Sequence, residues 1–533
     1  MPIWPPRPYA TALRSAQPTP TSPASQRCGG RTRWPNRNTD LMRAIRIIAK
    51  MLMMPVVRRP RAAAVGVALM MPGMALTGTA SSAPSPIAAY SLAAPTSAGK
   101  SGLVARAVVP AGSSCPSLVV DGRRFAMSWR KPAPNTGNAF ASVMVCNRVV
   151  PPGALAASVG GLPIPAAMPR AVQRIGIFDD NGCRILTGEV TQDCSDDRAW
   201  PLARISQRMA ASRPDVVLVP GDFFYRESAC PPTAQALCAG SPPPVTGMPF
   251  TDQAYGWIAD VMLPMQPVLR AAPLIVARGN HEDCWRAGNG YMLFMDPRPD
   301  TWDDCAPLPG PGGTVTAPEV ATAPYAIDLP VTARRTLRMV ITDTAPGSDR
   351  RVTAAAALMA PQFQKAATLA APAAGRESWL ITHRPIFGYV SSLIAAPGTS
   401  PWSSADAVQA SRGTLGSYRL IVSGHIHLAQ VTQIPGQATQ LVLGNGGTEL
   451  DPATGYALPS YGPGTPPYPA PTSNWTLAEF GYAVAQPGRR PGRWAIRLRD
   501  MDGRMQAACG LAAATLTCTP QWPSAGTSGP PGR

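Results

Sequence analysis

The chain has 533 residues and a formal net charge of +18, which by itself suggests nucleic acid or an anionic membrane as a partner. Residues 1–84 account for most of this charge, because they hold twelve Lys or Arg and one Asp and so carry +11. The remaining 449 residues carry +7, which is typical of a mildly basic soluble protein, and no nucleic-acid partner is expected.

Residues 1–84 are predicted to be a presequence with a signal peptide. Pro, Arg, Ser and Thr dominate its first half, and a basic run then precedes the apolar stretch 62–76 and small residues through Ala83. This order predicts cleavage after Ala80 or Ala83, no stable membrane span afterwards, and a periplasmic or secreted protein. An uncleaved anchor is the alternative, although the apolar stretch is short for a membrane-spanning helix.

Composition divides the rest of the chain into four parts. Residues 85–108 are rich in Pro, Ala and Ser and are predicted to be a linker. Residues 109–171 hold short alternating segments and are predicted to form a small β-rich lead-in. Residues 172–500 are long enough to bury a large core and are predicted to be the catalytic domain. Residues 501–533 are predicted to be a C-terminal segment with a disordered tail.

The cysteines favour an exported protein. Outside the presequence there are ten, an even number, and they lie in neighbouring pairs: Cys115 and Cys146, Cys183 and Cys194, Cys230 and Cys238, Cys284 and Cys305, Cys509 and Cys518. We expect nearest neighbours to form disulfides that fix loops, although sequence alone does not determine connectivity. Reduced, buried cysteine is the alternative.

Five short apolar runs within residues 172–500 each end in Gly, Asp, Asn or His. The runs are 175–178, 216–219, 274–277, 379–381 and 420–422. This pattern is typical of buried strands that deliver ligands from their carboxyl ends. Because open α/β sheets bind ligands outside those ends, we expect the motifs to meet in one crevice. A further strand is expected over 337–341, ending near Asp343, and helices over 203–209 and 354–370.

All four histidines of the chain fall in these motifs. His281 lies in Gly-Asn-His-Glu with Asn280, His383 follows the fourth run, and His425 and His427 form Gly-His-x-His. Two carboxylate motifs precede them, Asp179-Asp180-Asn181-Gly182 and Gly221-Asp222-Phe223-Phe224-Tyr225. Mixed carboxylate, amide and imidazole donors predict a site for iron, zinc or manganese rather than a thiolate site.

The ordered set Asp-x-Gly, Gly-Asp-x-x-Tyr, Gly-Asn-His-Glu, His and Gly-His-x-His resembles the calcineurin-like metallophosphoesterase superfamily. Within it, Tyr225 and Gly182 resemble the purple acid phosphatase branch. The resemblance covers about residues 172–452. It implies an α/β fold, a four-layer α/β/β/α sandwich, here preceded by the small β-rich N-terminal lead-in.

The resemblance also implies a role for each motif residue. The first metal would be bound by Asp180, Asp222, Tyr225 and His427. The second metal would be bound by Asp222 as a bridge, Asn280, His383 and His425. His281 would contact the phosphate or protonate the leaving oxygen. The cofactor would be two divalent or trivalent metal ions, iron together with zinc, manganese or iron.

Two positions depart from the family pattern. Asp179-Asp180 stands where Gly-Asp is more frequent, so either carboxylate is a candidate ligand, and Asp180 fits Asp-x-Gly better. Gly182 stands where most of the superfamily has a histidine, and Tyr225 is either the replacement ligand or a packed aromatic residue. Four arginines beside the motifs are candidates for orienting phosphate or for structural salt bridges: Arg226, Arg278, Arg286 and Arg384.

The sequence therefore predicts a secreted or periplasmic dinuclear-metal hydrolase. It would cleave small-molecule phosphate mono- or diesters by attack of a metal-bound hydroxide. The alternative is a non-catalytic secreted metal-binding or scaffold protein that retains the phosphoesterase fold. The sequence does not indicate the ester or the oligomeric state.

Overall fold

The computed structural model describes the chain from residue 85 to residue 520 with gaps. The described ranges are 85–96, 101–133, 136–186, 191–238, 252–298, 305, 321–349, 351–388, 404–452, 468–469 and 471–520. The predicted presequence 1–84 and the end of the predicted tail lie outside them. No helix in these ranges is long and apolar enough to cross a membrane.

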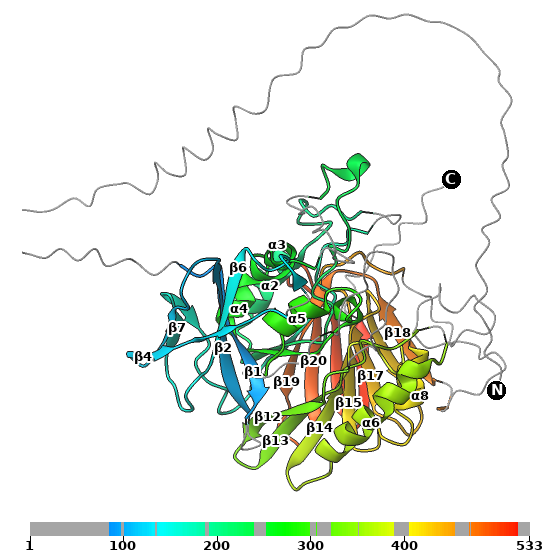
Figure 1. The fold of residues 1–533 in the computed structure, drawn as a ribbon. Coiled ribbons are helices and arrows are strands. Elements are labelled where there is room, and N and C mark those ends of the chain that lie inside the picture. The colour runs from blue at the N-terminus through cyan, green and yellow to red at the C-terminus, as the bar shows by residue number, and fades with distance from the viewer. Residues whose placement is uncertain are drawn as a thin grey trace, which may run out of the picture. The chain divides into compact units, whose positions relative to one another are not determined.

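The larger of the two main sheets has eleven strands. In spatial order they are β22 (Thr515–Pro520), β21 (Met505–Ala512), β20 (Arg493–Asp500), β19 (Gly481–Pro487), β9 (Ile175–Ile177), β10 (Val216–Val219), β11 (Leu274–Val276), β1 (Ala88–Pro95), β2 (Ser101–Pro110), β6 (Val143–Val149) and β5 (Ser128–Arg130). The central strands β9, β10, β11 and β1 are parallel neighbours. The carboxyl ends of β9, β10 and β11 therefore lie at the same edge (Figure 1).

The second sheet has seven strands. Its order is β12 (Tyr325–Thr332), β13 (Arg335–Ile341), β14 (Arg376–Ile381), β15 (Tyr418–Ser423), β17 (Thr439–Leu443), β16 (Ala429–Gln433) and β18 (Ser473–Leu477). Strands β13, β14, β15 and β17 are parallel, and Ile381 pairs with Val422. This register places the residues after β14 and β15 next to each other.

The region 109–171 is rich in strands, as predicted. Besides β5 and β6, it forms a separate four-stranded sheet in the order β4 (Arg123–Ala126), β3 (Ser117–Val120), β7 (Ala157–Val159) and β8 (Leu162–Ile164).

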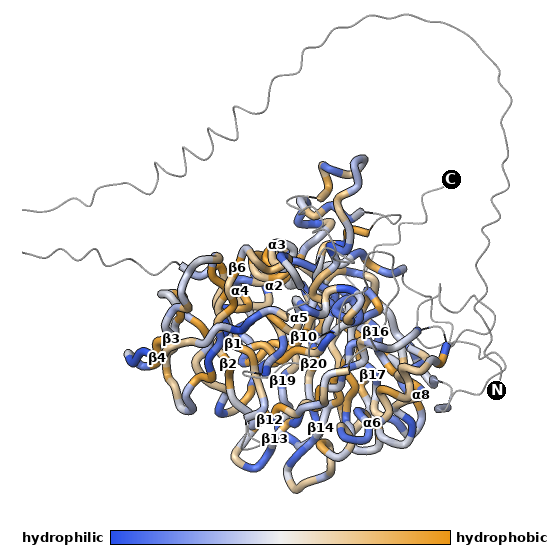
Figure 2. Tube along the Cα trace, in the orientation of Figure 1, coloured by the Kyte–Doolittle hydropathy of each residue, from blue (hydrophilic) through white to orange (hydrophobic). Residues whose placement is uncertain are grey.

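The two main sheets pack against each other through one hydrophobic core. Alternate residues of each strand enter it, such as Ile175 and Leu218 from the first sheet and Trp379 and Val422 from the second. Burial of such side chains stabilises the fold by roughly 1.5–3 kcal/mol each. In Figure 2, which colours the chain by hydropathy, the core strands are largely apolar and many turns are polar.

Helices cover the faces of the sheets that point away from this core. The first sheet packs on α2 (Leu202–Ala211), α3 (Ala254–Trp257), α4 (Gln266–Ala271) and α5 (Gly288–Phe294), and the second on α6 (Ala354–Leu369) and α8 (Ala405–Ala410). Single turns lie at Pro232–Ala234, Ile258–Met262 and Asn280–Glu282. The predicted mixed α/β class is confirmed, and so are the helices expected near 203–209 and 354–370.

Two predicted boundaries are wrong. Residues 85–108 are not a linker, because β1 and most of β2 lie in the eleven-stranded sheet and are almost entirely buried. The many alanines of these two strands are buried, and an alanine-rich composition alone does not distinguish such strands from a flexible spacer. The C-terminal segment also does not separate at residue 501, because β21 and β22 continue the same sheet to Pro520.

All five neighbouring cysteine pairs form disulfides, as predicted: Cys115–Cys146, Cys183–Cys194, Cys230–Cys238, Cys284–Cys305 and Cys509–Cys518. Cys183 follows the first carboxylate motif, and Cys284 follows Gly-Asn-His-Glu. These two bridges fix segments that leave the functional loops, at about 2–4 kcal/mol each in a typical domain.

Candidate metal centre

The predicted site residues come from both main sheets rather than from one open sheet. The loops after β9, β10 and β11 carry Asp180, Asp222 and Asn280, and the loops after β14 and β15 carry His383 and His425. Because the sheets pack face to face, their carboxyl-end loops meet across the top of the core. The single crevice expected from the sequence is therefore shared between two sheets.

Three of the candidate ligands have a backbone that their residue types rarely adopt. The φ angles of Asp180, Asp222 and His425 are 56°, 41° and 73°, in the left-handed region. Non-glycine residues in this region cost about 1–3 kcal/mol each and concentrate at functional sites. The surrounding loops hold these side chains inward at that cost.

The first cluster of donor atoms surrounds the phenol oxygen of Tyr225. It lies 2.7 Å from Oδ1 of Asp180, 2.8 Å from Oδ2 of Asp222 and 3.0 Å from Nε2 of His427. These are the four residues expected at the first metal. Tyr225 is therefore not only a packed aromatic residue, because its oxygen points into the donor set.

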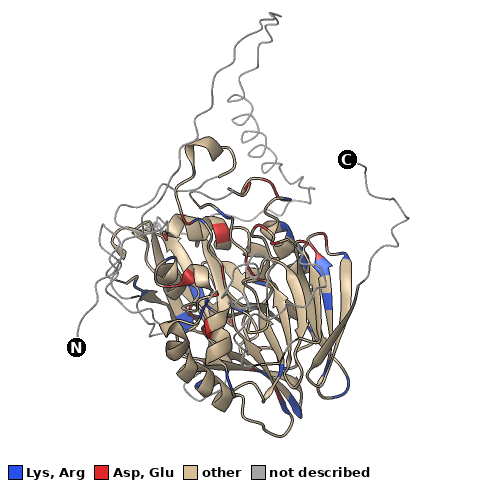
Figure 3. Cartoon of the chain, turned by 90° about the vertical axis from the view of Figure 1, so that its right-hand side faces the viewer, with Lys and Arg blue, Asp and Glu red and all other residues tan. Residues whose placement is uncertain are grey.

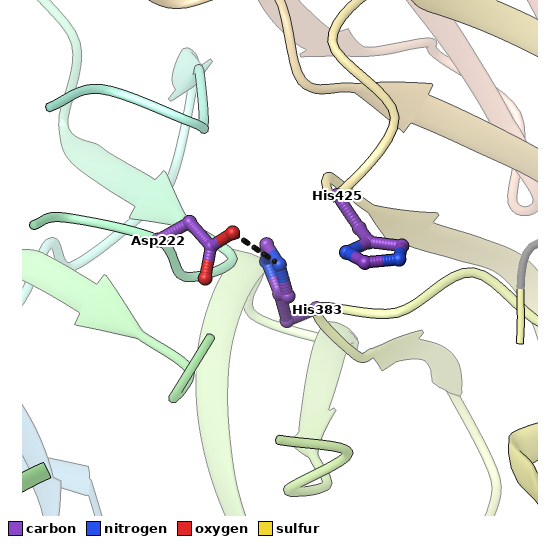
Figure 4. Close-up of side chains that lie close together, drawn as sticks. All are labelled: Asp222, His383 and His425. Atoms are coloured by element: carbon purple, nitrogen blue, oxygen red, sulfur yellow. Dashed lines mark ion pairs between the residues drawn. The ribbon is translucent and has the colours of Figure 1, made fainter. Parts of the chain in front are cut away.

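The second cluster surrounds Nε2 of His383, which lies 2.9 Å from Oδ2 of Asp222 and 3.0 Å from Oδ1 of Asn280. Candidate ligand atoms of Asp222, His383 and His425 all lie within 4.8 Å of one another (Figure 4). These are the four residues expected at the second metal. Oδ2 of Asp222 belongs to both clusters, as a bridging ligand must.

Gly182 has no room for the histidine that the family pattern would place there. A Cβ at this position would lie 2.6 Å from the backbone nitrogen of Tyr225 and 2.9 Å from the carbonyl oxygen of Phe223. A side chain would displace the loop that carries Tyr225. The glycine and the tyrosine therefore belong to one arrangement, in which the phenol takes the place beside Asp180.

The doublet Asp179-Asp180 divides its two carboxylates between different partners. Asp180 contacts Tyr225, whereas Oδ2 of Asp179 lies 3.1 Å from Nδ1 of His383, on the ring side away from Asn280. Burial and the neighbouring Asp180 raise the pKa of Asp179 well above its ordinary value. Asp179 orients His383, and Asp180 is the better-placed candidate ligand.

The other two candidate ligand histidines are also oriented through their second ring nitrogen. Nδ1 of His427 donates to the carbonyl of Glu449 at 2.7 Å, and this tautomer directs Nε2 toward Tyr225. Nε2 of His425 lies 3.0 Å from Oδ1 of Asp349, which leaves Nδ1 for the site. Such partners fix ring orientation and tautomer around metal ligands.

His281 lies beside the two clusters. Its Nδ1 is 2.9 Å from Oε1 of the buried Glu227, and its Nε2 is 3.9 Å from Oδ2 of Asp222. The ring packs 3.9 Å from the ring of Tyr225, centre to centre, and Glu227 lies 3.4 Å from Arg286. The imidazole is thus held with one nitrogen toward Glu227 and the other toward the donor clusters.

Charges are strongly coupled in this buried site. Burial opposes the charged form of Asp222, but His383 and His281 hold its pKa well below the ordinary value. Burial likewise lowers the pKa of His383, and Asp222 and Asp179 outweigh it and raise the pKa well above the usual range. For His427, Asp180 outweighs burial and raises the pKa to about 9. In the absence of other cations, the histidines supply the positive charge next to these carboxylates.

Two of the four candidate arginines serve the framework. Arg226 donates from Nε to Oδ1 of Asp260 at 2.5 Å, and Arg278 donates from Nε to the carbonyl of Glu282 and pairs with Asp343 at 3.3 Å. Asp343 also accepts a hydrogen bond from the backbone N–H of Ala345 at 2.9 Å. Asp343 therefore acts as a turn and support residue.

The other two arginines remain at the site. Arg286 pairs with Glu227, and Nη1 of Arg384 contacts Asp349 and lies 3.0 Å from Nε2 of His425. Burial raises the pKa of Asp349, but Arg384 and His425 outweigh it and hold the pKa below its ordinary value.

Sequence reasoning missed three carboxylates that hold the site residues: Glu227 beside His281, Asp349 beside His425, and Asp451, whose Oδ2 accepts from the backbone N–H of His427 at 2.9 Å. It also missed Glu282, which accepts hydrogen bonds from the N–H groups of Phe223 and Phe224 at 2.8 and 2.9 Å. Glu282 lies inside Gly-Asn-His-Glu, so its motif was a signal. The other three lie in loops with no distinguishing spacing.

The donor atoms from the two sheets form a candidate metal centre, and a family comparison bears on its class. Residues 192–429 match the family model of calcineurin-like phosphoesterases. The resemblance inferred from the motifs is confirmed. The matched segment includes Asp222 to His427 but begins after Asp180, in line with the unusual first motif.

Several solved structures are similar to the chain. The purple acid phosphatase PPD1 from yellow lupin (Lupinus luteus) seeds is 14% identical, with a TM-score of 0.48, over 80% of this chain and 74% of that one. PhoD is 11% identical, with a TM-score of 0.48, over 84% and 94%. GAP50, the anchor in the inner membrane complex of Plasmodium, is 11% identical, with a TM-score of 0.34, over 65% and 90%. The search of curated proteins finds no match.

Proposed function

We propose that the protein is a dinuclear-metal phosphoesterase that hydrolyses small-molecule phosphate mono- or diesters. One observation carries the proposal: two adjacent groups of donor atoms share Oδ2 of Asp222, one around the phenol of Tyr225 and one around Nε2 of His383. A shared carboxylate of this kind can bridge a pair of metal ions that clamps a phosphoryl group.

The residues fit metal ions on electrostatic grounds. Asp179, Asp180 and Asp222 are fully buried, and their ion pairs go to His383, His427 and His281. Buried carboxylates are costly unless a cation or several hydrogen bonds compensate them. Bound metals would supply that charge and would leave the imidazoles neutral, which is the form that coordinates.

The two donor groups differ in chemistry. Asp180, Asp222 and Tyr225 give the first position three hard oxygen donors beside His427, which favours ferric iron. Asn280, His383 and His425 with Asp222 give the second position more nitrogen, which suits zinc, manganese or ferrous iron. This division supports the purple-acid-phosphatase-like branch, with Tyr225 as a ligand.

When bound, the metals would supply Lewis-acid activation of the phosphate and a water of lowered pKa. The chain supplies the rest of the chemistry. Glu227 accepts from Nδ1 of His281 and stabilises the imidazolium, from which Nε2 can give a proton to the leaving oxygen. Arg384 and Arg286 lie beside the site, where their guanidinium groups would bind substrate oxygens.

A periplasmic or secreted location is part of the proposal. Five disulfides support an oxidising compartment, because such bonds are rare where thiols are kept reduced. A small-molecule phosphoester is the expected substrate.

The direct test is hydrolysis of an aryl phosphate and an aryl phosphodiester by purified protein. Activity should disappear with a chelator, return with added metal, and be absent in His425→Ala while the thermal unfolding curve remains cooperative. If metal-replete, folded protein hydrolyses neither ester, the non-catalytic binding or scaffold function replaces the enzyme. If His425→Ala keeps full activity, the assigned site is wrong.

A further inference from the structure

A second site is suggested by a cavity of about 850 Å³ among turns of the two sheets. Its wall is made by the β12–β13 turn, the starts of β14 and β15, and the β19–β20 and β21–β22 turns. Figure 3 shows basic positions among the turns at the lower ends of the strands.

This cavity lies at the strand ends opposite the metal centre. Strands β13, β14 and β15 are parallel, begin beside the cavity, and end beside the site. Arg376 lines the cavity, and His383 lies seven residues further on, which at 3.3 Å per residue is roughly 20 Å. A ligand in the cavity therefore cannot touch the metal ligands.

The lining is strongly positive. It contains six arginines and one acidic residue, Glu377; the arginines are Arg334, Arg335, Arg376, Arg419, Arg489 and Arg493. Four of the six are exposed to solvent: Arg334, Arg419, Arg489 and Arg493. The six arginines come from four separate chain segments, so the fold gathers them.

Two arginines at the floor of the cavity have N–H groups that could donate hydrogen bonds to a ligand. Nη1 of Arg335 donates to the carbonyl of Gly488 at 2.8 Å, but among the described residues its buried Nη2 has no hydrogen-bond partner and lies 3.7 Å from Glu377. Nε of Arg376 is also buried and has no hydrogen-bond partner within the described part of the chain. Oε1 of Glu377 is occupied by the indole N–H of Trp494 at 2.9 Å. One carboxylate thus neutralises only part of the positive charge.

We infer that this cavity is a non-catalytic binding site for a compact anion with two or more phosphate groups. Guanidinium groups bind phosphate oxygens in pairs, and a multivalent anion relieves the repulsion among converging arginines. The volume matches a small-molecule pocket. Among the described residues that line it, none is aromatic, and Trp494, which donates to Glu377, is buried and offers no face for base stacking. These features favour a small oligophosphate over a nucleic-acid strand.

Binding of methylenediphosphonate, a diphosphate analogue that resists hydrolysis, tests the inference in the metal-loaded enzyme. Isothermal titration should show a component that orthophosphate at the metal centre does not compete away. The double variant Arg419→Gln/Arg493→Gln should weaken this component at least about tenfold and leave hydrolysis of an aryl phosphate unchanged. Raising the salt from 50 to 200 mM should weaken it several-fold, because exposed charges are screened.

Arg270→Gln is the matched control, since Arg270 is exposed on α4, away from the cavity, and should bind the analogue like the wild type. Unchanged binding in the double variant would overturn the inference, and so would binding that only His425→Ala removes. If the protein bound a single-stranded oligonucleotide but not the diphosphonate, the ligand of the cavity would be a nucleic acid and not a small oligophosphate.

Discussion

The two ends of the parallel strands in the two main sheets place opposite charges in opposite environments. After the carboxyl ends of β9 and β10, Asp180 and Asp222 are fully buried, and a strained backbone and hydrogen bonds hold them in place. At the amino ends of β15 and β20, Arg419 and Arg493 are exposed and line an open cavity.

The contrast between buried carboxylates and exposed arginines shows how one pair of sheets can support two kinds of site. A buried group is held by many contacts, so its loss is felt strongly and its interactions are little affected by salt. An exposed group contributes through charge alone, which solvent and salt weaken. Changes at the metal end should therefore exceed those at the basic end.

The largest effect is expected for Asp222→Asn, since Asp222 belongs to both donor clusters. We expect kcat to fall by at least about 10²–10³-fold, the scale of removing a main electrostatic group. Steady-state kinetics with an aryl phosphate measures it. The control is Asp197→Asn, because the side chain of Asp197 is 71% exposed and makes only a loose pair with Arg204 at 3.9 Å. Equal activity of the two variants would remove Asp222 from the centre.

A second change separates a tyrosine ligand from a packed aromatic residue. Tyr225→Phe keeps the ring beside His281 and removes the phenol oxygen that lies within 3.0 Å of three site residues. We expect the visible tyrosinate-to-iron absorbance to vanish and activity to fall about 10–100-fold. Wild-type protein that is active, zinc-loaded and colourless would show instead that iron is absent and that Tyr225 is no ferric ligand.

A smaller loss is expected for Glu227→Gln, which keeps a hydrogen-bond acceptor near His281 but removes the charge. Partners of this kind change activity by about 10–100-fold, and we expect the lower part of that range. The fall should appear in kcat rather than KM, and it should shrink for an ester whose leaving group is a weak base and needs no proton. An equal fall for both esters would mean that Glu227 serves only the structure.

The smallest effect is a change in stability with pH. It comes from Asp252, a buried carboxyl group that belongs neither to the metal centre nor to the basic cavity. Burial raises its pKa to about 7, against about 4 in an unfolded chain. Between these values the folded protein keeps a proton that the unfolded chain has lost. Rising pH therefore lowers the free energy of unfolding by up to about 1.4 kcal/mol per pH unit from this group.

Asp252→Asn removes this proton. The free energy of unfolding, measured in urea, should fall between pH 5.5 and pH 6.5. This fall should be smaller in the variant than in the wild type by about 1 kcal/mol. The amide also changes the contacts with Trp257 and Gly290, which shifts the free energy of unfolding equally at both pH values. Comparing the pH-dependent change in the two proteins removes this constant shift. Identical declines would show that Asp252 is ionised throughout.

Much of the site could be predicted because its residues follow apolar runs. The runs before Asp180, Asp222 and His425 became strands β9, β10 and β15, and their ends do meet. Spacing along the chain carried this information, since each motif is short and its strand lies next to it.

The rest depends on contacts that spacing does not encode. Glu227 and Asp349 gain their roles only from histidines more than fifty residues away. Arg226 lies next to Tyr225 in sequence, yet it turns to Asp260. Strand β1 was missed because its alanines resemble a spacer until a neighbouring strand buries them.

The central claim is that two metal ions share Asp222, and metal counting by inductively coupled plasma mass spectrometry tests it most directly. After reconstitution and removal of loose metal, the wild-type protein should hold two metal atoms per chain. His427→Ala and His383→Ala should each retain about one, and Asp222→Asn fewer than either. A folded wild-type protein that holds one metal atom or none would contradict the account.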